Sequence, residues 1–174
     1  MEELDVRWYA LYTRSRHEKV VVGQLGEKNI ECFLPLRETI SYWKDRRKKV
    51  QHPLFPGYVF VHASIRERRL DILKVPAAVG LIESNGGPIS IPEEQIQSVR
   101  RLLSSTLLYD PYPEVVQGDR VEVIRGPLRG VYGILVRKKT GDRFVLAVDL
   151  IQQAVACEID ACNLKKINGK QRPN

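Results

Sequence analysis

A proline-containing segment, residues 105–116, divides this 174-residue chain into two parts with different sequence patterns. Pro111 and Pro113 remove two backbone donors there, which is typical of a linker. The residues before the segment alternate between strand-like and helix-like patterns, whereas those after it alternate in polarity and show no helical period. The sequence therefore predicts an α+β chain, with a mixed domain at 1–104, a linker at 105–116, a β domain at 117–167 and a basic tail at 168–174.

The first domain is expected to fold as a small sheet with helices on one face. Residues 6–13 are typical of a strand that places Trp8 and Tyr12 on one face and Tyr9 and Leu11 on the other. If the helices cover the second face, the Trp8 face stays partly open, which is typical of a partner-binding surface; its cover by the third helix or the linker is the alternative. Further strands are expected at 30–42, 57–63 and 79–83, and helices at 15–28, from 64 to before Pro76, and from Pro92 onwards.

The expected helices have recognisable starts, and the second domain has regular turns. Ser15 with Glu18, and Ser64 with Glu67, fit capping boxes. In the second domain Gly133 permits a bend. Five short strands in this part of the chain, at 118–124, 131–138, 143–150, 154–159 and 164–167, indicate a small closed barrel.

Four motifs occur in order along the chain: Trp8-Tyr9, then PLFPGYVF at 53–60, VPAAVG at 75–80, and GDRVEV from Gly118 with GPLRG at 126–130. Together they resemble the NusG-like transcription elongation factors over nearly the whole chain. The resemblance implies an NGN-type α/β sandwich as the N-terminal domain and a small SH3-like KOW β-barrel as the C-terminal domain.

Three further segments resemble specialised antiterminators of the UpxY and RfaH type, namely 125–130, 135–139 and 148–153. Pro127-Leu128 stands where the housekeeping factor usually carries a Phe-rich loop. The resemblance implies a factor that binds RNA polymerase across its clamp, suppresses pausing and termination, and recruits partners through the KOW domain on one long operon, such as a polysaccharide operon. Two alternatives stay open: a housekeeping NusG that couples polymerase to Rho and the ribosome, and a ribosome-associated KOW RNA-binding protein.

The aromatic motif at 55–58 is the sharpest candidate site. Pro56 and Gly57 shape a turn that can direct Phe55 and Tyr58 at one patch. The resemblance implies that the clamp helices of the largest polymerase subunit contact four rings: Trp8, Tyr12, Phe55 and Tyr58. Core positions are the alternative for Phe55 and Trp8.

Basic residues form a second candidate site. The chain has 28 Lys and Arg against 21 Asp and Glu, a net charge of +7, which favours a polyanionic partner. They gather at the start of the first helix and in a charged turn expected at 44–49. The resemblance implies contact with non-template DNA or nascent RNA, while the second helix reaches a loop of the second-largest polymerase subunit; a solvated surface is the alternative. The predicted nucleic-acid-binding residues are Arg14, Arg16, His17, Lys44, Arg46 and Arg47.

The loop at 126–130 presents Leu128 and Arg129 as candidate partner-binding residues. The resemblance implies a small-subunit ribosomal protein as the partner, and Rho in housekeeping factors; a simple connection between strands is the alternative. Pro76-Ala77 replaces part of a basic pair found at the base-reading edge of relatives, so the recognised sequence should differ.

The remaining sequence signals point away from catalysis, metals and membranes. Enzyme motifs are absent: there is no Gly-Lys-Ser/Thr phosphate loop, nucleophile elbow or histidine–carboxylate pattern, so neither an enzyme nor a cofactor is expected. The three cysteines form no CxxC pair, which indicates reduced thiols and no metal site. With no signal-peptide pattern and no membrane-length apolar run, we expect a cytoplasmic monomer.

Overall fold

The computed structural model describes residues 5–43, 46–112, 118–138, 141–148, 151 and 153–167. The chain divides into two compact units, Met1–Ile96 and Gln97–Asn174. Helix α3 (Glu93–Ser104) begins in the first unit and ends in the second. None of the helices in the described part of the chain is long and apolar enough to cross a membrane. The predicted combination of an N-terminal α/β part and a β-rich C-terminal part is confirmed.

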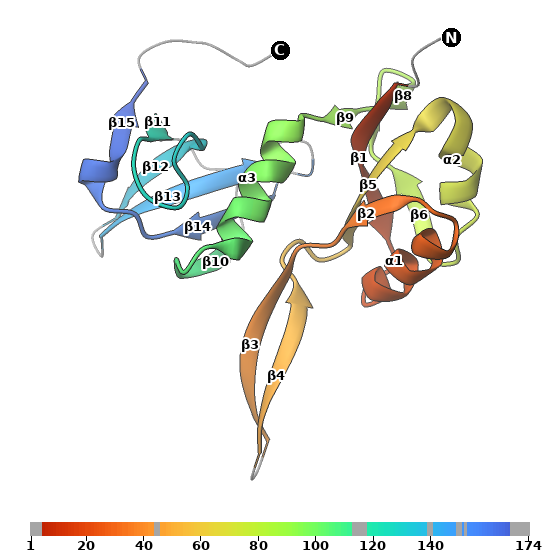
Figure 1. The fold of residues 1–174 in the computed structure, drawn as a ribbon, viewed down its shortest axis with the longest axis horizontal. Helices are drawn as coiled ribbons and strands as arrows, with labels where there is room; N and C mark the ends of the chain where they lie inside the picture. The colour runs from red at the N-terminus through yellow and green to blue at the C-terminus, as the bar shows by residue number, and fades with distance from the viewer. Residues whose placement is uncertain are drawn as a thin grey trace. The chain divides into compact units, whose positions relative to one another are not determined.

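The first unit is built around a five-stranded antiparallel sheet (Figure 1). Its central strand β1 (Val6–Thr13) occupies the predicted residues. β1 pairs on one side with β5 (Tyr58–Ser64) and on the other with β6 (Ala78–Leu81) and β9 (Ser90–Ile91). β2 (Glu31–Phe33) pairs with the outer edge of β5.

Two helices cover one face of this sheet: α1 (Glu18–Glu27) and α2 (Ile65–Leu73). Tyr9 and Leu11 of β1 belong to the core on that face, as the alternation of β1 predicted. They pack in one cluster with Val21 and Leu25 of α1, Val59 and Val61 of β5, and Ile72 and Val75 of α2 and its end.

The capping prediction for the first helix is wrong. α1 begins at Glu18, and His17 is the residue before it, with no side-chain cap. The Glu18 carboxylate instead accepts a hydrogen bond from the backbone of Gly57, far along the chain. Ser64 does precede α2, but its hydroxyl makes no capping bond either.

Strands β3 (Leu36–Trp43) and β4 (Arg46–Pro53) form a long hairpin that extends away from the sheet (Figure 1). Among the described strands they pair only with each other, in a register that runs from Leu36 opposite Pro53 to Trp43 opposite Arg46. The charged turn expected at 44–49 is therefore too long, because 46–49 are strand residues. A second, short hairpin joins β7 (Glu83–Ser84) to β8 (Gly87–Pro88).

The second unit is a six-stranded antiparallel sheet in the order β10-β14-β13-β12-β11-β15. It has one strand more than the five expected. The extra strand, β10, lies inside the segment expected to link the domains. β10 is an edge of the sheet, where the missing donor of Pro111 costs no ladder hydrogen bond. The elements are β10 (Tyr109–Tyr112), β11 (Asp119–Val123), β12 (Tyr132–Lys138), β13 (Gly141–Val148), β14 (Gln153–Cys157), the 3-10 turn η2 (Ala161–Asn163) and β15 (Leu164–Lys166).

Gly133 on β12, where the sequence predicts a bend, lies in close packing against β13. A Cβ there would lie 2.5 Å from Cζ of Phe144 and 2.7 Å from the carbonyl oxygen of Val145. Phe144 is fully buried, so its ring cannot move aside freely. Glycine is thus required for the β12–β13 contact. The predicted basic tail, 168–174, lies outside the described residues.

Candidate functional site

Two tyrosines form a pair at the end of the central strands that is partly open to solvent. Tyr12 of β1 lies directly opposite Tyr58 of β5, and their ring centroids are 5.4 Å apart. Tyr12 is 45% exposed, while Tyr58 is partly buried. Burial, and then the neighbouring Tyr12, raise the pKa of Tyr58, so its phenol stays protonated and can donate a hydrogen bond. The pair offers a partner two rings and a polar rim.

The turn beneath this pair is held from two sides. Gly57 has φ +83°, and a Cβ there would lie 3.2 Å from Cε2 of Tyr12, so glycine fits both the backbone and the ring. Its carbonyl accepts a 2.8 Å hydrogen bond from the Thr13 amide, and its amide donates a 2.8 Å bond to Oε1 of Glu18. Glu18 is only 4% exposed. It positions the turn, and we refer to Tyr12, Glu18, Phe55, Gly57 and Tyr58 as the aromatic turn.

The other two predicted rings lie in the interior. Phe55 is 1% exposed and meets Phe60 edge-on, with centroids 6.0 Å apart. Trp8 is 2% exposed and stacks on His62 at 4.7 Å. The four aromatic residues therefore separate into an accessible pair and a buried pair that supports it.

Sequence reasoning missed the role of Glu18. Its only local signal was the capping-box spacing from Ser15, which pointed to a different bond. A carboxylate that is buried beside a helix start must find a donor. The donor lies 39 residues away, at Gly57, so that only the folded chain reveals it.

The basic residues at the start of α1 lie on an exposed turn. Arg14, Arg16 and His17 all face solvent. The Arg14 amide donates a 2.9 Å hydrogen bond to the carbonyl of Ala77, so the predicted basic edge and the segment after Pro76 are neighbours. Arg16 has φ +65°, and Nδ1 of His17 lies 2.9 Å from the carbonyl oxygen of Ser15. The backbone holds this turn while the side chains stay available.

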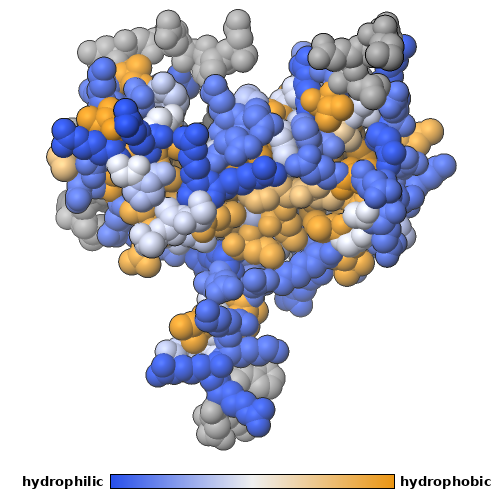
Figure 2. Space-filling view, viewed as in Figure 1, coloured by the Kyte–Doolittle hydropathy of each residue, from blue (hydrophilic) through white to orange (hydrophobic). Residues whose placement is uncertain are grey.

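The remaining basic residues lie on the hairpin. Arg46 and Arg47 are exposed strand residues, and Lys44 lies outside the described residues. The Arg47 guanidinium lies over the Tyr42 ring, 5.6 Å from its centroid, and Tyr42 is 72% exposed. Figure 2 shows the hairpin as largely hydrophilic on the visible face. Nζ of Lys19 on α1 donates a 3.1 Å hydrogen bond to the Gln51 carbonyl and so ties the helix start to the hairpin base.

The predicted loop of the second unit separates its two candidate residues. Arg129 is exposed, whereas Leu128 is fully buried, so Leu128 is not available as a surface anchor in this structure. Nη1 of Arg101 donates a 3.1 Å hydrogen bond to the Arg129 carbonyl. The loop has a tight shape because Gly126 and Gly130 both take positive φ.

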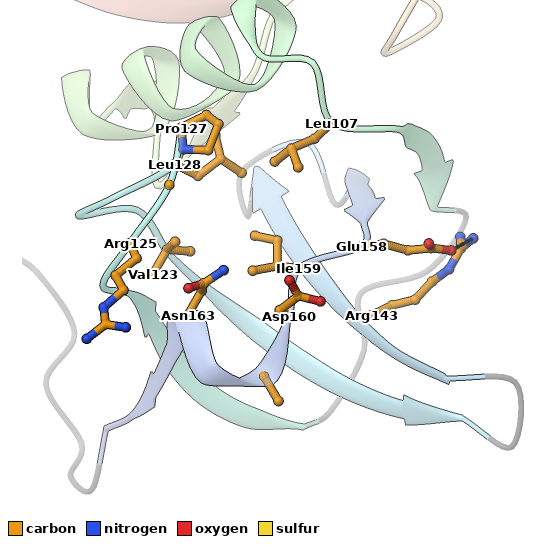
Figure 3. A pocket seen from close by; sticks show the side chains of 12 residues that line it. Leu107, Val123, Arg125, Pro127, Leu128, Arg143, Glu158, Ile159, Asp160 and Asn163 are labelled. Carbon is orange, nitrogen blue, oxygen red and sulfur yellow. Dashed lines mark hydrogen bonds and ion pairs between the residues drawn. The ribbon is translucent and has the colours of Figure 1, made fainter.

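Leu128 also lines a cavity of about 570 Å³ in this unit (Figure 3). Figure 3 shows Arg143 beside Glu158 at one end of the cavity and Arg125 at the other. Nη2 of Arg143 lies 3.5 Å from Oε1 of Glu158. Val123 and Ile159 add apolar surface between them. The cavity combines apolar surface with charges of both signs.

The described residues show no metal-ligand cluster, and burial raises the pKa of two of the three cysteines. Within those ranges, no three His, Cys, Asp or Glu side chains gather to hold a metal ion. Burial, and less so Glu31, raises the pKa of Cys32 to about 11, and burial raises that of Cys157 to about 12. Thiols with raised pKa values ionise little and are poor nucleophiles.

Comparison with known proteins identifies the family. The family model described as "Transcription termination factor nusG" matches residues 6–100, more than half of the chain. The chain belongs to the NusG family. This is a family of transcription termination and antitermination factors rather than of enzymes, as the motifs predicted.

Individual relatives match over almost the whole chain. The "Transcription termination/antitermination protein NusG" of Lactococcus lactis is 23% identical, and the alignment covers 94% of each chain. The protein of the same name from Pasteurella multocida is 25% identical over 93% of this chain and 96% of its own. The solved structure titled "Domain interaction in Thermotoga maritima NusG" covers 94% of this chain and 98% of its own, with a TM-score of 0.58 and 20% identity, which shows a shared fold.

Proposed function

We propose that this protein binds RNA polymerase through the Tyr12–Tyr58 pair, which is partly open to solvent, and acts as an antitermination factor on a particular long operon. The observation that carries the proposal is the aromatic turn: two accessible rings on a backbone fixed by Gly57 and the buried Glu18. Rigid aromatic side chains are typical of binding hot spots. Trp8 and Phe55 belong to the same predicted contact, and we assign them a supporting role because they are buried.

The mechanism is a shift between polymerase states. In this proposal the first unit contacts the clamp helices of the largest subunit, and α2 reaches a loop of the second-largest subunit. A paused polymerase rearranges its clamp, and a factor that binds the elongating state more tightly disfavours that rearrangement. A difference of about 1.4 kcal/mol changes such an equilibrium tenfold.

The basic edge contacts nucleic acid in this proposal. Arg14, Arg16 and His17 are exposed beside Ala77, and they would meet the non-template strand or the nascent RNA. Cations on a held backbone attract phosphate without any change of fold. The hairpin residues Arg46 and Arg47, with Lys44, extend the same contact.

The second unit recruits a partner in this proposal, through Arg129 and the loop that carries Leu128. The expected partner is a small-subunit ribosomal protein. Because Leu128 is buried, the loop must rearrange before that side chain serves as an apolar anchor. Such a factor acts as a monomer in the cytoplasm, where transcription and translation meet.

A second candidate function is that of a housekeeping factor that couples polymerase to Rho and the ribosome. It is favoured by the names of the relatives, which are termination/antitermination proteins matched over more than nine-tenths of this chain. In vitro transcription through a Rho-dependent terminator separates the two candidates. Increased Rho-dependent release on any template indicates the housekeeping function, whereas read-through restricted to one operon's leader indicates the specialised one.

The polymerase contact is tested by Tyr58→Ala in the full chain, with affinity for core polymerase measured by biolayer interferometry. Loss of a hot-spot ring costs about 2 kcal/mol, so we expect about 30-fold weaker binding with an unchanged circular dichroism spectrum. The control is Tyr132→Ala, which removes an exposed tyrosine from the second unit. Unchanged affinity of the Tyr58 variant would remove this residue from the interface.

A further inference from the structure

The hairpin of β3 and β4 is rich in charged side chains. Residues 36–53 contain six Lys and Arg against two acidic residues, which gives more than half of the chain's net charge of +7. The hairpin pairs with no other described strand. A two-stranded ribbon with both faces in solvent gains little from its own packing. Its sequence is therefore better explained by a partner than by stability.

Cations occupy both faces of the ribbon. The register puts Ile40, Tyr42, Arg47 and Lys49 on one face, which we call the aromatic face. On the opposite face, Thr39 and Ser41 lie across from Val50 and Lys48. Arg37 and His52 follow nearer the base, and the register position of Trp43 opposite Arg46 follows nearer the end; we call this the hydroxyl face.

The two faces differ in the ion pairs that the structure gives to Arg46, Lys48 and Lys49. On the aromatic face, Nζ of Lys49 lies 3.5 Å from Oε2 of Glu38, in an exposed ion pair of little strength. On the hydroxyl face, Arg46 and Lys48 contact no carboxylate among the residues that the structure describes. Each face therefore offers positive charge to a separate row of phosphates.

The base of the hairpin is anchored, so the ribbon has a defined direction. The Leu54 amide donates a 2.8 Å hydrogen bond to the Pro35 carbonyl and closes the base, and Leu54 itself is buried. The Lys19 ammonium donates a hydrogen bond to the carbonyl of Gln51, which lies on β4 two residues before Pro53. An arm held in this way binds with a smaller loss of conformational entropy than a free tail.

We propose that the β3–β4 hairpin enters the major groove of double-stranded DNA, with one face toward each phosphate wall. This deepens the proposed function, on which it rests, by naming duplex DNA as the target of the hairpin residues. A ribbon with side chains on both faces is about 10 Å thick. That thickness fits the major groove, which is about 12 Å wide, and exceeds the minor groove at about 6 Å. Each eight-residue strand is about 26 Å long, most of one helical turn.

The distribution of charge favours a duplex over a single strand. A single strand presents one row of phosphates and would be bound by one face of the ribbon at a time, for example by the aromatic face with bases stacked on Tyr42. Such a contact gives the cations of the other face no role. Duplex RNA has a deep, narrow major groove that a ribbon of this width cannot enter.

Two charge-matched double variants of the full chain test the proposal: Arg47→Ala with Lys49→Ala on the aromatic face, and Arg46→Ala with Lys48→Ala on the hydroxyl face. Binding to a fluorescent duplex and to its single strand is followed by anisotropy over a range of salt concentrations. Each phosphate contact contributes about 0.9 to the slope of log K against log salt for duplex DNA. We expect both variants to lower the duplex slope by about 1.8. The control, Lys28→Ala with Lys74→Ala, removes two exposed lysines elsewhere in the first unit and should leave the slope unchanged.

Dimethyl sulfate footprinting at saturating protein identifies the groove, since guanine N7 lies in the major groove and adenine N3 in the minor groove. Protection of N7 supports the proposal. Protection of N3 alone, no protection, or an effect of the aromatic-face variant only would overturn it. The polymerase contact is tested separately, because the hairpin variants should retain polymerase affinity while Tyr58→Ala should retain duplex binding. Failure of the duplex assay with an intact polymerase contact therefore rejects the hairpin proposal alone.

Discussion

The aromatic turn and the hairpin, both in the first unit, are built in opposite ways. In the aromatic turn, each exposed ring depends on buried neighbours: Gly57 packs under Tyr12, and Glu18 holds Gly57. In the hairpin, none of the residues whose burial is described is buried, and contacts such as that of Arg47 over Tyr42 are exposed. In a surface like the aromatic turn, a few residues contribute most of the free energy of binding and of folding. In a surface like the hairpin, many exposed charges each contribute a small part. Single substitutions should therefore have large effects in the turn and small effects in the hairpin.

The largest effect is expected for Phe55→Ala. Because the ring is 1% exposed and packs on Phe60, its loss leaves a cavity and should lower the free energy of unfolding by about 3–5 kcal/mol. Urea denaturation followed by circular dichroism measures this change.

The matched control for Phe55 lies on the hairpin. Ile40 is exposed, so Ile40→Ala should change the free energy of unfolding by no more than about 0.5 kcal/mol. Similar values for the two variants would contradict the contrast between the turn and the hairpin. Similar values would also mean that Phe55 is not a core residue, and a direct contact between Phe55 and the polymerase would then be considered again.

The next largest effect is expected for Glu18→Ala. It leaves the Gly57 amide without its acceptor in a buried site, which costs about 1–3 kcal/mol in the free energy of unfolding. Glu18→Gln keeps an acceptor oxygen and should lose less. The exposed Glu27 of the same helix provides the control, and Glu27→Ala should leave the urea midpoint almost unchanged. A Glu18→Ala variant as stable as the control would mean that water replaces the carboxylate.

The sequence predicted the elements whose signal is local. The alternation along β1 put Tyr9 and Leu11 on the face that the helices cover, and both lie in the core there. The boundaries of β1 were also predicted from its run of aromatic and apolar residues. Such patterns depend only on the period of apolar residues along the chain, so they can be recognised without knowing which element packs against them.

The features that the sequence did not predict depend on distant partners. The hydrogen bond from the Gly57 amide to Glu18 joins two separate elements. The spacing of Glu18 from Ser15 indicated a capping box instead, and that prediction was wrong. β10 was taken for a linker because Pro111 opposes a central strand, but an edge position tolerates it. The hairpin residues Arg46 and Arg47 were placed in a turn because a ribbon exposed on both faces has no polar–apolar alternation to reveal it.

At the candidate site, too, local sequence signals were predictive and contacts formed only in the folded chain were not. The FPGY motif and Tyr12 drew attention to the right turn, since Pro56 and Gly57 restrict the backbone by their own chemistry. Which rings would be exposed could not be predicted, because the edge-on contact of Phe55 with Phe60 of β5 forms only once the turn between them has folded. Leu128 lies in a loop without a hydrophobic period, so the sequence pattern did not indicate its burial either.

The smallest effect is expected within the hairpin and separates its two faces. Arg47→Ala removes a cation from above the exposed Tyr42 ring, an interaction worth about 0.5 kcal/mol at such a site. Lys48→Ala removes the same charge from the opposite face, where no ring contact is described, and should cost less than Arg47→Ala. Urea denaturation of both variants at low and high salt measures the difference, which should persist in salt if the ring contact is partly desolvated. If both variants lose the same free energy of unfolding and the loss disappears in high salt, both residues act only through long-range charge. Tyr42 would then be available to stack on another group. A loss above about 2 kcal/mol for either would show that the hairpin contains a structural contact of the kind found in the aromatic turn.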